Sequence, residues 1–399
     1  MQFFKSLFLG LLFTLTSLPA GSGAISIDVY PHHKITPKVF IISMFTPETQ
    51  TWHHIPEFNL LAHNISIPGL SPLFPYIHCT HSHEICQITT GEGEINAAST
   101  LTALTLSPHF NLTNTYFLIA GIAGISPEIG PTASVTFARF AVQVALQHEI
   151  DVRELSRNYS TGYIPLGAEV PGVFPETVYG TEVFEVNEEL RSIAAEFARN
   201  VTLADTDVAK VYRAKYAGSK GGLYDAATAE PTILECDTST SDVYFSGRLL
   251  GEAFANTTKA LTGNKGVYCT TQQEDNATLE SLLRGAAAGL VDFSRIIIMR
   301  SASDFERPYP GQMATENLFS EEQGAFEPAV ENLYRAGVKV VLGILEYWEE
   351  RFEGGVKAKN YLGDAFGTLG GRPEFGGESG SVVKRGLEGR KRGMGRGRR

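Results

Sequence analysis

Short apolar runs alternate along this chain with segments whose apolar residues recur every three or four positions. Most of the runs are continuously apolar, which is typical of strands buried on both faces of a sheet. They predict strands at Lys38–Phe45, Ile85–Thr90, Thr115–Ala120, Gly266–Thr271, Arg295–Arg300 and Val338–Ile344. Helical spacing predicts helices at Glu94–Leu106, Asn187–Val201, Ala277–Val291 and Glu327–Ala336. This alternation predicts a three-layer α/β fold, with a mainly parallel sheet flanked by helices.

The domain organisation follows from where these patterns stop. Residues 205–266 carry turn residues and polar clusters, and we interpret them as an insertion or lid rather than a second core. Core residues become scarce after about residue 370. The motifs described below belong to one large domain, so we expect that domain over residues 25–371 and a disordered Gly/Arg-rich basic tail over residues 372–399.

Charge and hydropathy exclude two classes of protein. The formal net charge is -11, but residues 384–399 hold eight basic side chains and one acidic one, which leaves -18 for the rest. An acidic body repels phosphate backbones, so we expect no nucleic-acid partner. A bilayer-spanning helix needs roughly 20 apolar residues. The N-terminal segment alone approaches that length, which excludes a polytopic membrane protein.

The N-terminal segment has the features of a secretory signal. Lys5 supplies a positive charge, residues 7–15 form a short apolar core, and Ser22-Gly23-Ala24 is a small-residue cleavage site. We expect a signal peptide over residues 1–24, no stable membrane span after cleavage, and a secreted or cell-surface protein. Asn-x-Ser/Thr sequons are consistent with a secreted glycoprotein and occur at Asn64, Asn111, Asn158, Asn200, Asn256 and Asn276.

An exported chain with four cysteines can form two disulfides, with three possible connectivities. Proximity favours pairing Cys79 with Cys86. The tightest histidine cluster, His78, His81 and His83, lies around these cysteines. Its spacing matches no standard zinc pattern, and exported cysteines are expected to pair with each other, so we predict no metal site.

Gly91 and Gly93 lie between a predicted strand and a predicted helix, in the run that starts at Thr89. Glycine lets a ligand approach the backbone closely. The free N–H groups of the helix start, together with the hydroxyl of Thr90, can bind an anion such as phosphate. A tight turn without a ligand explains the motif equally well. The motif is not a dinucleotide fingerprint, because a third glycine and an acidic residue near Ala120 are missing.

Three further predicted strands end in residues suited to a ligand. Ala120 is followed by Gly121 and Gly124, against which a flat base can lie, although helix–strand packing explains the glycines as well. Glu274 and Asp275 follow the next such strand, where a carboxylate can accept two sugar hydroxyls. The alternative is that residues at this position simply cap the following helix.

The last of these strands is followed by Ser303 and Asp304, with Phe305 next in sequence. Desolvation beside an apolar side chain raises the pKa of a carboxyl group, which would suit Asp304 to act as an acid. A helix cap is again the alternative interpretation.

Taken together, the four strand-end motifs resemble the nucleoside phosphorylase fold, and the match to the purine nucleoside permease family of fungi and bacteria is closer still. The resemblance covers about residues 38–371. It is carried by Thr-Thr-Gly-Glu-Gly-Glu-Ile-Asn-Ala-Ala from Thr89, Tyr-Phe-Leu-Ile-Ala-Gly-Ile-Ala-Gly from Tyr116, Gly-Thr-Glu-Val-Phe from Gly180, Tyr-Cys-Thr-Thr-Gln-Gln-Glu-Asp from Tyr268 and Met-Arg-Ser-Ala-Ser-Asp-Phe from Met299.

The resemblance implies a protein that handles purine nucleosides, in a family named for nucleoside uptake whose fold resembles enzymes that split the N-glycosidic bond. It implies that Glu274 holds ribose hydroxyls and that Asp304 faces N7 of the purine. We take Asp304 as the candidate catalytic residue, and as candidate substrate-binding residues Thr90, Gly91, Ala120, Gly121, Glu274, Asp275 and Ser303. We expect no cofactor, phosphate as a possible co-substrate, and a homo-oligomer by resemblance only.

One departure from the phosphorylase pattern affects the expected chemistry. Residues 43–48 replace the glycine-rich turn that phosphorylases have after the first strand, which weakens the phosphate site and leaves water as a candidate nucleophile. The leading hypothesis is therefore N-glycosidic bond cleavage by phosphorolysis or hydrolysis. The alternative is a non-catalytic nucleoside-binding component of transmembrane transport. A third hypothesis is an α/β protein whose pocket has lost its ligand.

Overall fold

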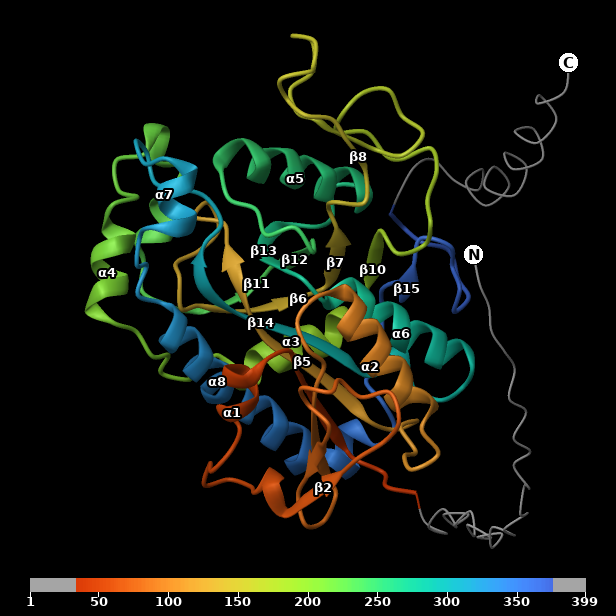
Figure 1. Cartoon of the computed structure of the whole chain (residues 1–399). Helices are drawn as coiled ribbons and strands as arrows, with labels where there is room; N and C mark the ends of the chain where they lie inside the picture. Colours follow the sequence, from red (N-terminus) through yellow and green to blue (C-terminus); the bar gives the residue numbers. More distant parts are fainter. Residues whose placement is uncertain (1–33, 376–399) are drawn as a thin grey trace, which may run out of the picture. The chain divides into compact units, whose positions relative to one another are not determined.

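The computed structural model describes residues 34–375 (Figure 1). The predicted signal peptide, residues 1–24, lies outside the described residues, and so does the predicted basic tail beyond residue 375. In the described part, helices pack against both faces of a central mixed sheet. The predicted three-layer α/β fold is confirmed.

The central sheet has 13 strands within residues 34–375. They are β1 (Val39–Ser43), β2 (His63–Ile65), β3 (Ile77–Cys79), β4 (Ile85–Thr89), β5 (Tyr116–Ile125), β6 (Val135–Ala138), β7 (Phe140–Gln143), β10 (Val183–Glu185), β11 (Ile233–Glu235), β12 (Asp237–Thr240), β13 (Tyr268–Gln272), β14 (Ile296–Phe305) and β15 (Gly363–Asp364). A small separate sheet pairs β8 (His148–Glu149) with β9 (Tyr163–Ile164).

The strand order in the main sheet is β15-β10-β7-β12-β13-β5-β1-β4-β3-β2, and β14 pairs with β5 beside this path. The long central pairings of β1 with β4, β1 with β5, and β5 with β14 are parallel. Antiparallel pairings occur toward the margins, as between β3 and β4 or β10 and β15, and also in the middle of the sheet, between β5 and β13 and between β6 and β14. Because β1, β4, β5 and β14 run in parallel, their carboxyl ends meet along one edge of the sheet, where α/β proteins place their ligands.

The described residues also form helices, of which some cover the two faces of the sheet. They are α1 (Thr46–Gln50), α2 (Glu94–Leu106), α3 (Glu188–Ala198), α4 (Asp207–Ala214), α5 (Arg248–Leu261), α6 (Asp275–Ala287), α7 (Ala314–Phe319) and α8 (Phe326–Glu346). Helices α2 and α6 pack side by side on one face of the sheet, and α3 and α8 pack together on the other (Figure 1).

Strand β1 shows why the predicted strands are continuously apolar. Its side chains alternate between faces, so Phe40 and Ile42 pack in the cluster that contains α2 and α6. Val39 and Ile41 pack in the cluster that contains α3 and α8. All four side chains are fully buried. A strand covered by helices on both faces has no solvent-facing position, so the alternating pattern disappears.

The predicted strand Val338–Ile344 is wrong, because these residues form the second half of α8. A short apolar run fits a buried helix as well as a buried strand. Here Val340 and Ile344 continue the helical spacing of Leu333 toward the sheet, and all three are buried in one cluster. The helix also approaches its neighbours closely, since a Cβ on Gly337 would lie 2.5 Å from the ring of Trp52.

The interpretation of residues 205–266 as an insertion or lid is also wrong, because this segment supplies β12 to the middle of the sheet. β12 has the sequence Asp-Thr-Ser-Thr and is buried along its length. Burial is tolerated because the polar atoms have partners. Asp237 accepts backbone N–H bonds from Arg139 at 2.9 Å, Phe140 at 2.8 Å and Val267 at 2.7 Å.

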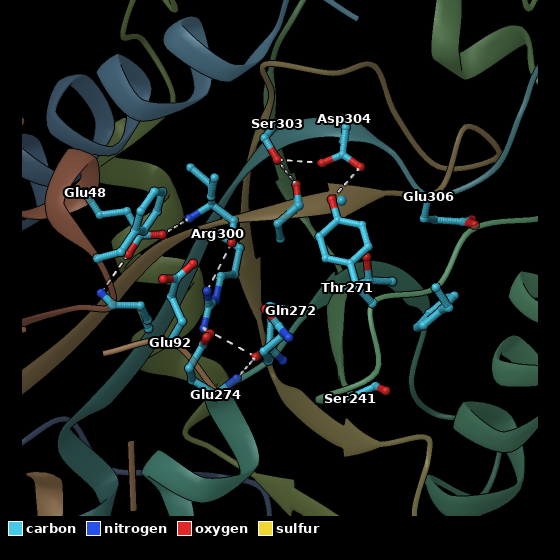
Figure 2. A pocket seen from close by; sticks show the side chains of 18 of the residues that line it. Glu48, Glu92, Ser241, Thr271, Gln272, Glu274, Arg300, Ser303, Asp304 and Glu306 are labelled. Atoms are coloured by element: carbon cyan, nitrogen blue, oxygen red, sulfur yellow. Dashed lines mark hydrogen bonds and ion pairs between the residues drawn. The ribbon is translucent and has the colours of Figure 1, made fainter. Parts of the chain in front are cut away.

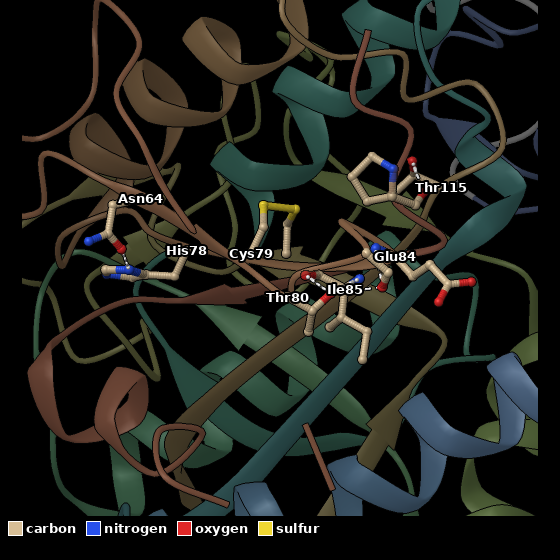
Figure 3. The surroundings of a disulfide bond; sticks show 10 residues. Asn64, His78, Cys79, Thr80, Glu84, Ile85 and Thr115 are labelled. Atoms are coloured by element: carbon tan, nitrogen blue, oxygen red, sulfur yellow. Dashed lines mark hydrogen bonds between the residues drawn. A yellow bond between two sulfur atoms is a disulfide. The ribbon is translucent and has the colours of Figure 1, made fainter. Parts of the chain in front are cut away.

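Two disulfides join the four cysteines. The predicted pair Cys79–Cys86 is confirmed and connects directly opposed residues of β3 and β4 (Figure 3). The second disulfide joins Cys236, which precedes β12, to Cys269 in β13. The segments that follow these two strands line the cavity described below. The second disulfide therefore links the starts of the two strands that carry these segments.

Candidate functional site

A cavity of about 310 Å³ opens at the carboxyl-terminal side of the central strands (Figure 2). Its walls come from β5, β13 and β14, from the segment after β1, from the segment between β12 and α5, and from the start of α8. The lining residues are Met44, Phe45, Glu48, Glu92, Ile122, Ala123, Gly124, Ser241, Val243, Tyr244, Phe245, Thr271, Gln272, Gln273, Glu274, Arg300, Ser303, Asp304, Glu306 and Phe326. Pockets of this volume suit small-molecule ligands.

Asp304 lines one end of the cavity from β14. The pairing of β14 with β5 shifts register between Ala302 and Asp304, and such a bulge re-aims side chains. As a result, the consecutive residues Ser303 and Asp304 both line the cavity. The Ser303 hydroxyl donates to Asp304 Oδ1 at 2.7 Å, and the Tyr244 hydroxyl donates to Oδ2 at 3.4 Å. Burial raises the pKa of Asp304 although both hydroxyls act in the opposite direction.

Arg300 interacts electrostatically with three acidic groups on the other side of the cavity, Asp275, Glu274 and Glu48. Its guanidinium forms ion pairs with Asp275 and, at 3.3 Å, with Glu274, and its Nη1 donates to the carbonyl of Ile122 at 3.1 Å. Burial raises the pKa of Glu274 despite the nearby Arg300. The cluster holds the carboxyl group of Glu274 at the cavity wall, where Arg300 partly compensates its negative charge.

Glu48 completes this cluster from α1 and is almost fully buried. Its two carboxyl oxygens accept the backbone N–H groups of Met44 and Ile122, each at 2.7 Å. Burial, opposed by the charge of Arg300, raises the pKa of Glu48 to about 8. A carboxyl group with this pKa has both protonation states accessible near neutral pH, as a proton-transfer group requires.

At the glycine-rich start of α2, two backbone N–H groups are already bonded to carboxylates of the protein. The N–H of Gly93 donates to Glu274 Oε1 at 3.0 Å, and the N–H of Glu94 donates to Asp242 Oδ1 at 2.8 Å. Two carboxylates of the protein thus take the place that an external anion would occupy at this helix start. Gly91 and Gly93 both have φ of 87°, a conformation that glycine adopts without strain.

The structure brings three of the sequence-predicted site residues to the cavity wall, Glu274, Ser303 and Asp304. The other five, Thr90, Gly91, Ala120, Gly121 and Asp275, lie outside the lining residues. Thr90 is buried and its N–H donates to the carbonyl of Ser43, while Ala120 is part of the core that contains α3 and α8. Asp275 lies behind the wall, where it pairs with Arg300.

Gly121 lies within β5 next to the acidic cluster. A Cβ at this position would be 2.5 Å from Arg300 Nη1 and 2.9 Å from Glu48 Oε1. Glycine therefore leaves the space in which these two side chains meet. The predicted strands that end at Ala120 and Arg300 are longer in the structure, so Gly121 and Asp304 lie within β5 and β14 rather than after them.

Sequence reasoning missed Glu48, Arg300 and Tyr244. Arg300 carried a usable signal, because a charged residue inside a continuously apolar strand requires a buried partner. Glu48 belongs to residues 43–48, which lack the glycines of the phosphorylase pattern. Nothing in that segment predicts that its carboxyl group binds the backbone N–H of Ile122 in β5. Tyr244 belongs to the region interpreted as a lid.

Within residues 34–375, no group of three or more His, Cys, Asp or Glu side chains is arranged to hold a metal ion. In the same range, no helix is both long enough and apolar enough to cross a membrane.

Solved structures with a similar course of the chain include nucleosidases at low sequence identity. The futalosine hydrolase of Helicobacter pylori aligns with a TM-score of 0.46 and 15% identity, over 77% of this chain and 98% of that one. A 5′-methylthioadenosine/S-adenosylhomocysteine nucleosidase of Neisseria meningitidis aligns with a TM-score of 0.44 and 14% identity, over 77% and 99%. At this identity and TM-score, the likeness does not establish the chemistry of this chain, which depends on its own residues.

Sequence relatives are much closer. A purine nucleoside permease of Candida albicans is 48% identical over 349 residues, which cover 86% of this chain and 84% of the relative. A probable purine nucleoside permease of Schizosaccharomyces pombe is 41% identical over 353 residues, covering 86% and 98%. The model of the family described as purine nucleoside permease (NUP) matches residues 36–357. This chain therefore belongs to the purine nucleoside permease family.

Proposed function

We propose that this protein binds purine nucleosides in the cavity and hydrolyses their N-glycosidic bond. The observation that carries the proposal is that Asp304, with its raised pKa, shares one cavity with the carboxyl groups of Glu48 and Glu274. Cleavage leaves positive charge on the ribose and negative charge on the departing base. An acid at one end of the cavity can protonate the departing base, and carboxylates at the other end can stabilise the positive ribose.

Each group has a distinct part in the proposed reaction. The electrons of the bond between the ribose C1′ and the base move onto the base, which takes a proton from Asp304. A water oxygen bonds to C1′ and gives up a proton to Glu48. Glu274 stabilises the positive ribose and accepts hydrogen bonds from its hydroxyls, since one carboxylate can accept two O–H bonds.

Water suits this cavity better than phosphate as the nucleophile. Among the residues that line the cavity, five are acidic (Glu48, Glu92, Glu274, Asp304 and Glu306), and Arg300 is the one cationic side chain. Arg300 is already paired with Asp275 and Glu274. The N–H groups of Gly93 and Glu94 at the start of α2 already donate to Glu274 and Asp242. A phosphate dianion would meet repulsion from these acidic groups, and the one cationic side chain that could compensate it is already paired.

A non-catalytic role in nucleoside transport is the second candidate, and the observation that favours it is the name that the curated relatives carry. In this case the cavity would bind a nucleoside and deliver it intact. The two functions differ in whether free base appears.

The deciding experiment incubates the purified protein with inosine, adenosine, guanosine or uridine, with and without inorganic phosphate, and measures free base. Base release without phosphate supports hydrolysis. Release that requires phosphate overturns water as the nucleophile, and binding without release favours the transport role. We expect Asp304→Asn to lower turnover by about 100-fold or more and to keep nucleoside binding. Asp225→Asn, on the exposed surface, is the matched control and should retain activity.

We also propose that the protein acts outside the cell or at its surface. The two disulfides support this location, because disulfides persist in oxidising compartments. When the full chain carrying a C-terminal tag is expressed in yeast, the tag should appear in the medium or in a protease-accessible position. N-terminal sequencing should then begin at residue 25, whereas cytosolic retention of the intact chain would contradict the proposal.

A further inference from the structure

The carboxylate of Asp304 is held by one hydroxyl on each of its oxygens (Figure 2). Ser303, its neighbour in β14, donates to Oδ1 at 2.7 Å. Tyr244 donates to Oδ2 at 3.4 Å from the segment between β12 and α5, which is far away in the sequence. The bond from Tyr244 is long for an O–H···O hydrogen bond and is therefore the weaker of the two.

The segment that carries Tyr244 is anchored on both sides of this residue. Before it, Asp242 accepts the N–H of Glu94 at 2.8 Å, and its carbonyl accepts the side-chain amide of Gln273 at 3.0 Å. After it, the ring of Phe245 packs edge-on against Phe254 of α5, with ring centroids 4.6 Å apart. The side chain of Tyr244 itself is 61% exposed. It can therefore move while the backbone around it stays in place.

Tyr244 and a bound base compete for the same atom. Ser303 already occupies Oδ1, so Oδ2 is the oxygen through which Asp304 can reach a nitrogen of the base. The Tyr244 hydroxyl lies on that oxygen, and its ring lines the cavity. A nitrogen of the base that approaches Oδ2 therefore meets the Tyr244 hydroxyl at the same atom.

We propose that Tyr244 is a positioning residue whose hydroxyl orients the Asp304 carboxylate and yields Oδ2 to a base nitrogen when a nucleoside binds. The inference rests on the proposed function, because it assumes that Asp304 protonates the base. In this order of events, Asp304 takes a proton from solvent as the Tyr244 hydroxyl moves away from Oδ2. It then gives that proton to the base nitrogen as the glycosidic electron pair moves onto the base.

The electrostatics support this order of events. A hydroxyl that donates to a carboxylate stabilises its charged form, and Tyr244 accordingly lowers the pKa of Asp304 while burial raises it. When the hydroxyl is displaced, the effect of burial on the pKa of Asp304 is less opposed and this pKa rises. Arrival of the base therefore favours the protonated form of Asp304. The other titratable groups that interact with Asp304 are Glu306, which follows it in sequence, and Tyr216, which follows α4. Glu306 is compensated by Arg307 at 2.6 Å.

The variant Tyr244→Phe tests the proposal, because it keeps the ring and removes the hydroxyl. In the ligand-free protein, the titration of the Asp304 carboxyl carbon by NMR should move to higher pH by about half a unit to one unit, the size expected for one hydrogen bond. The alkaline limb of kcat/KM against pH should move in the same direction. Inosine should bind several-fold more tightly, because no hydroxyl has to be displaced.

Tyr179→Phe is the matched control, since Tyr179 is equally exposed, at 61%, and lies outside the cavity. It should change none of these quantities. If Tyr244→Phe titrates like the parent, or binds inosine more weakly, the proposal is overturned. The NMR and binding measurements do not need turnover. A parent protein that releases no base would therefore defeat the proposed hydrolysis, while the titration and affinity would still decide the role of Tyr244.

Discussion

The backbone N–H of Gly93 donates a hydrogen bond to Glu274 Oε1 at 3.0 Å, which joins the start of α2 to the acidic wall of the cavity. This bond and the ion pair with Arg300 fix the Glu274 carboxylate in place. A preorganised charge of this kind stabilises a transition state without reorganisation. In Glu274→Gln the side-chain oxygen can still accept the N–H, but the negative charge is lost. We expect kcat for base release to fall about 100-fold.

Glu280→Gln is the control for this prediction, because Glu280 lies on α6, the helix that Glu274 precedes, and pairs with Arg284 away from the cavity. Its turnover should match that of the parent. Thermal unfolding of both variants should show that they are folded. A folded Glu274→Gln variant with parental kcat would remove Glu274 from the proposed mechanism.

Gly121→Ala should displace the side chains of the acidic cluster that lines the cavity. The added Cβ would lie 2.5 Å from Arg300 Nη1, 2.8 Å from Met44 Sδ and 2.9 Å from Glu48 Oε1. Arg300 is buried and paired with Glu274 and Asp275, so it cannot move away without breaking these ion pairs. Overpacking of this kind costs about 1–3 kcal/mol of unfolding free energy. Urea unfolding should show this loss, together with weaker nucleoside binding.

Gly354→Ala provides the comparison. A Cβ on Gly354 meets nothing within 4 Å, and its φ is not in the left-handed region, so this variant should be as stable as the parent. Equal stability of the two glycine variants would show that the backbone near Gly121 can relax and that its lack of a side chain is not required.

Much of the fold could be predicted because the core strands carry their own signal. Phe40 and Ile42 face one helical layer while Val39 and Ile41 face the other, so four apolar residues in succession indicate a strand buried on both sides. β12 gave no such signal. Its polar residues are buried only because Asp237 accepts N–H groups from β7 and from the segment before β13, and those partners are known only in the folded chain.

The candidate site was predictable to the extent that it depends on single strands. Asp304 and Glu274 could be singled out because each stands close to the end of an apolar run. Glu48 could not, since the N–H of Ile122 that holds it is 74 residues away. The pairing of β1 with β5 brings these residues together, and local sequence does not encode that pairing.

The sequon at Asn276 should remain free of glycan in a folded protein made by a glycosylating host. The Asn276 side chain is 1% exposed. Its Oδ1 accepts the Thr240 hydroxyl at 2.7 Å, and its Nδ2 donates to the carbonyl of Thr181 at 2.7 Å. A sugar on Nδ2 would have no space and would break the second bond. Peptide mass spectrometry should find Asn276 unmodified, with Asn256, an exposed sequon, as the internal comparison. Full occupancy at Asn276 in active protein would contradict the described packing.

Stability should fall as pH rises through the neutral range, and Glu48 should account for part of the fall. Burial raises the pKa of Glu48 from 4.5 to about 8. Between these values the folded state binds a proton that the unfolded chain releases. The contribution of Glu48 is therefore fully present below pH 4.5 and is lost as pH rises through about 8. The limiting slope for one group is about 1.4 kcal/mol per pH unit.

Glu48→Gln removes this titration, so its unfolding free energy should decline less steeply between about pH 5 and about pH 8 than that of the parent. Glu306, whose pKa burial raises to about 7, contributes a similar decline in both proteins, so the unfolding free energy of the variant will still fall with rising pH. Urea unfolding at several pH values measures the two slopes. Glu350→Gln, at an exposed position, should reproduce the parental slope. If Glu48→Gln does so as well, Glu48 is ionised in the folded protein throughout this range, which would contradict the rise of its pKa by burial.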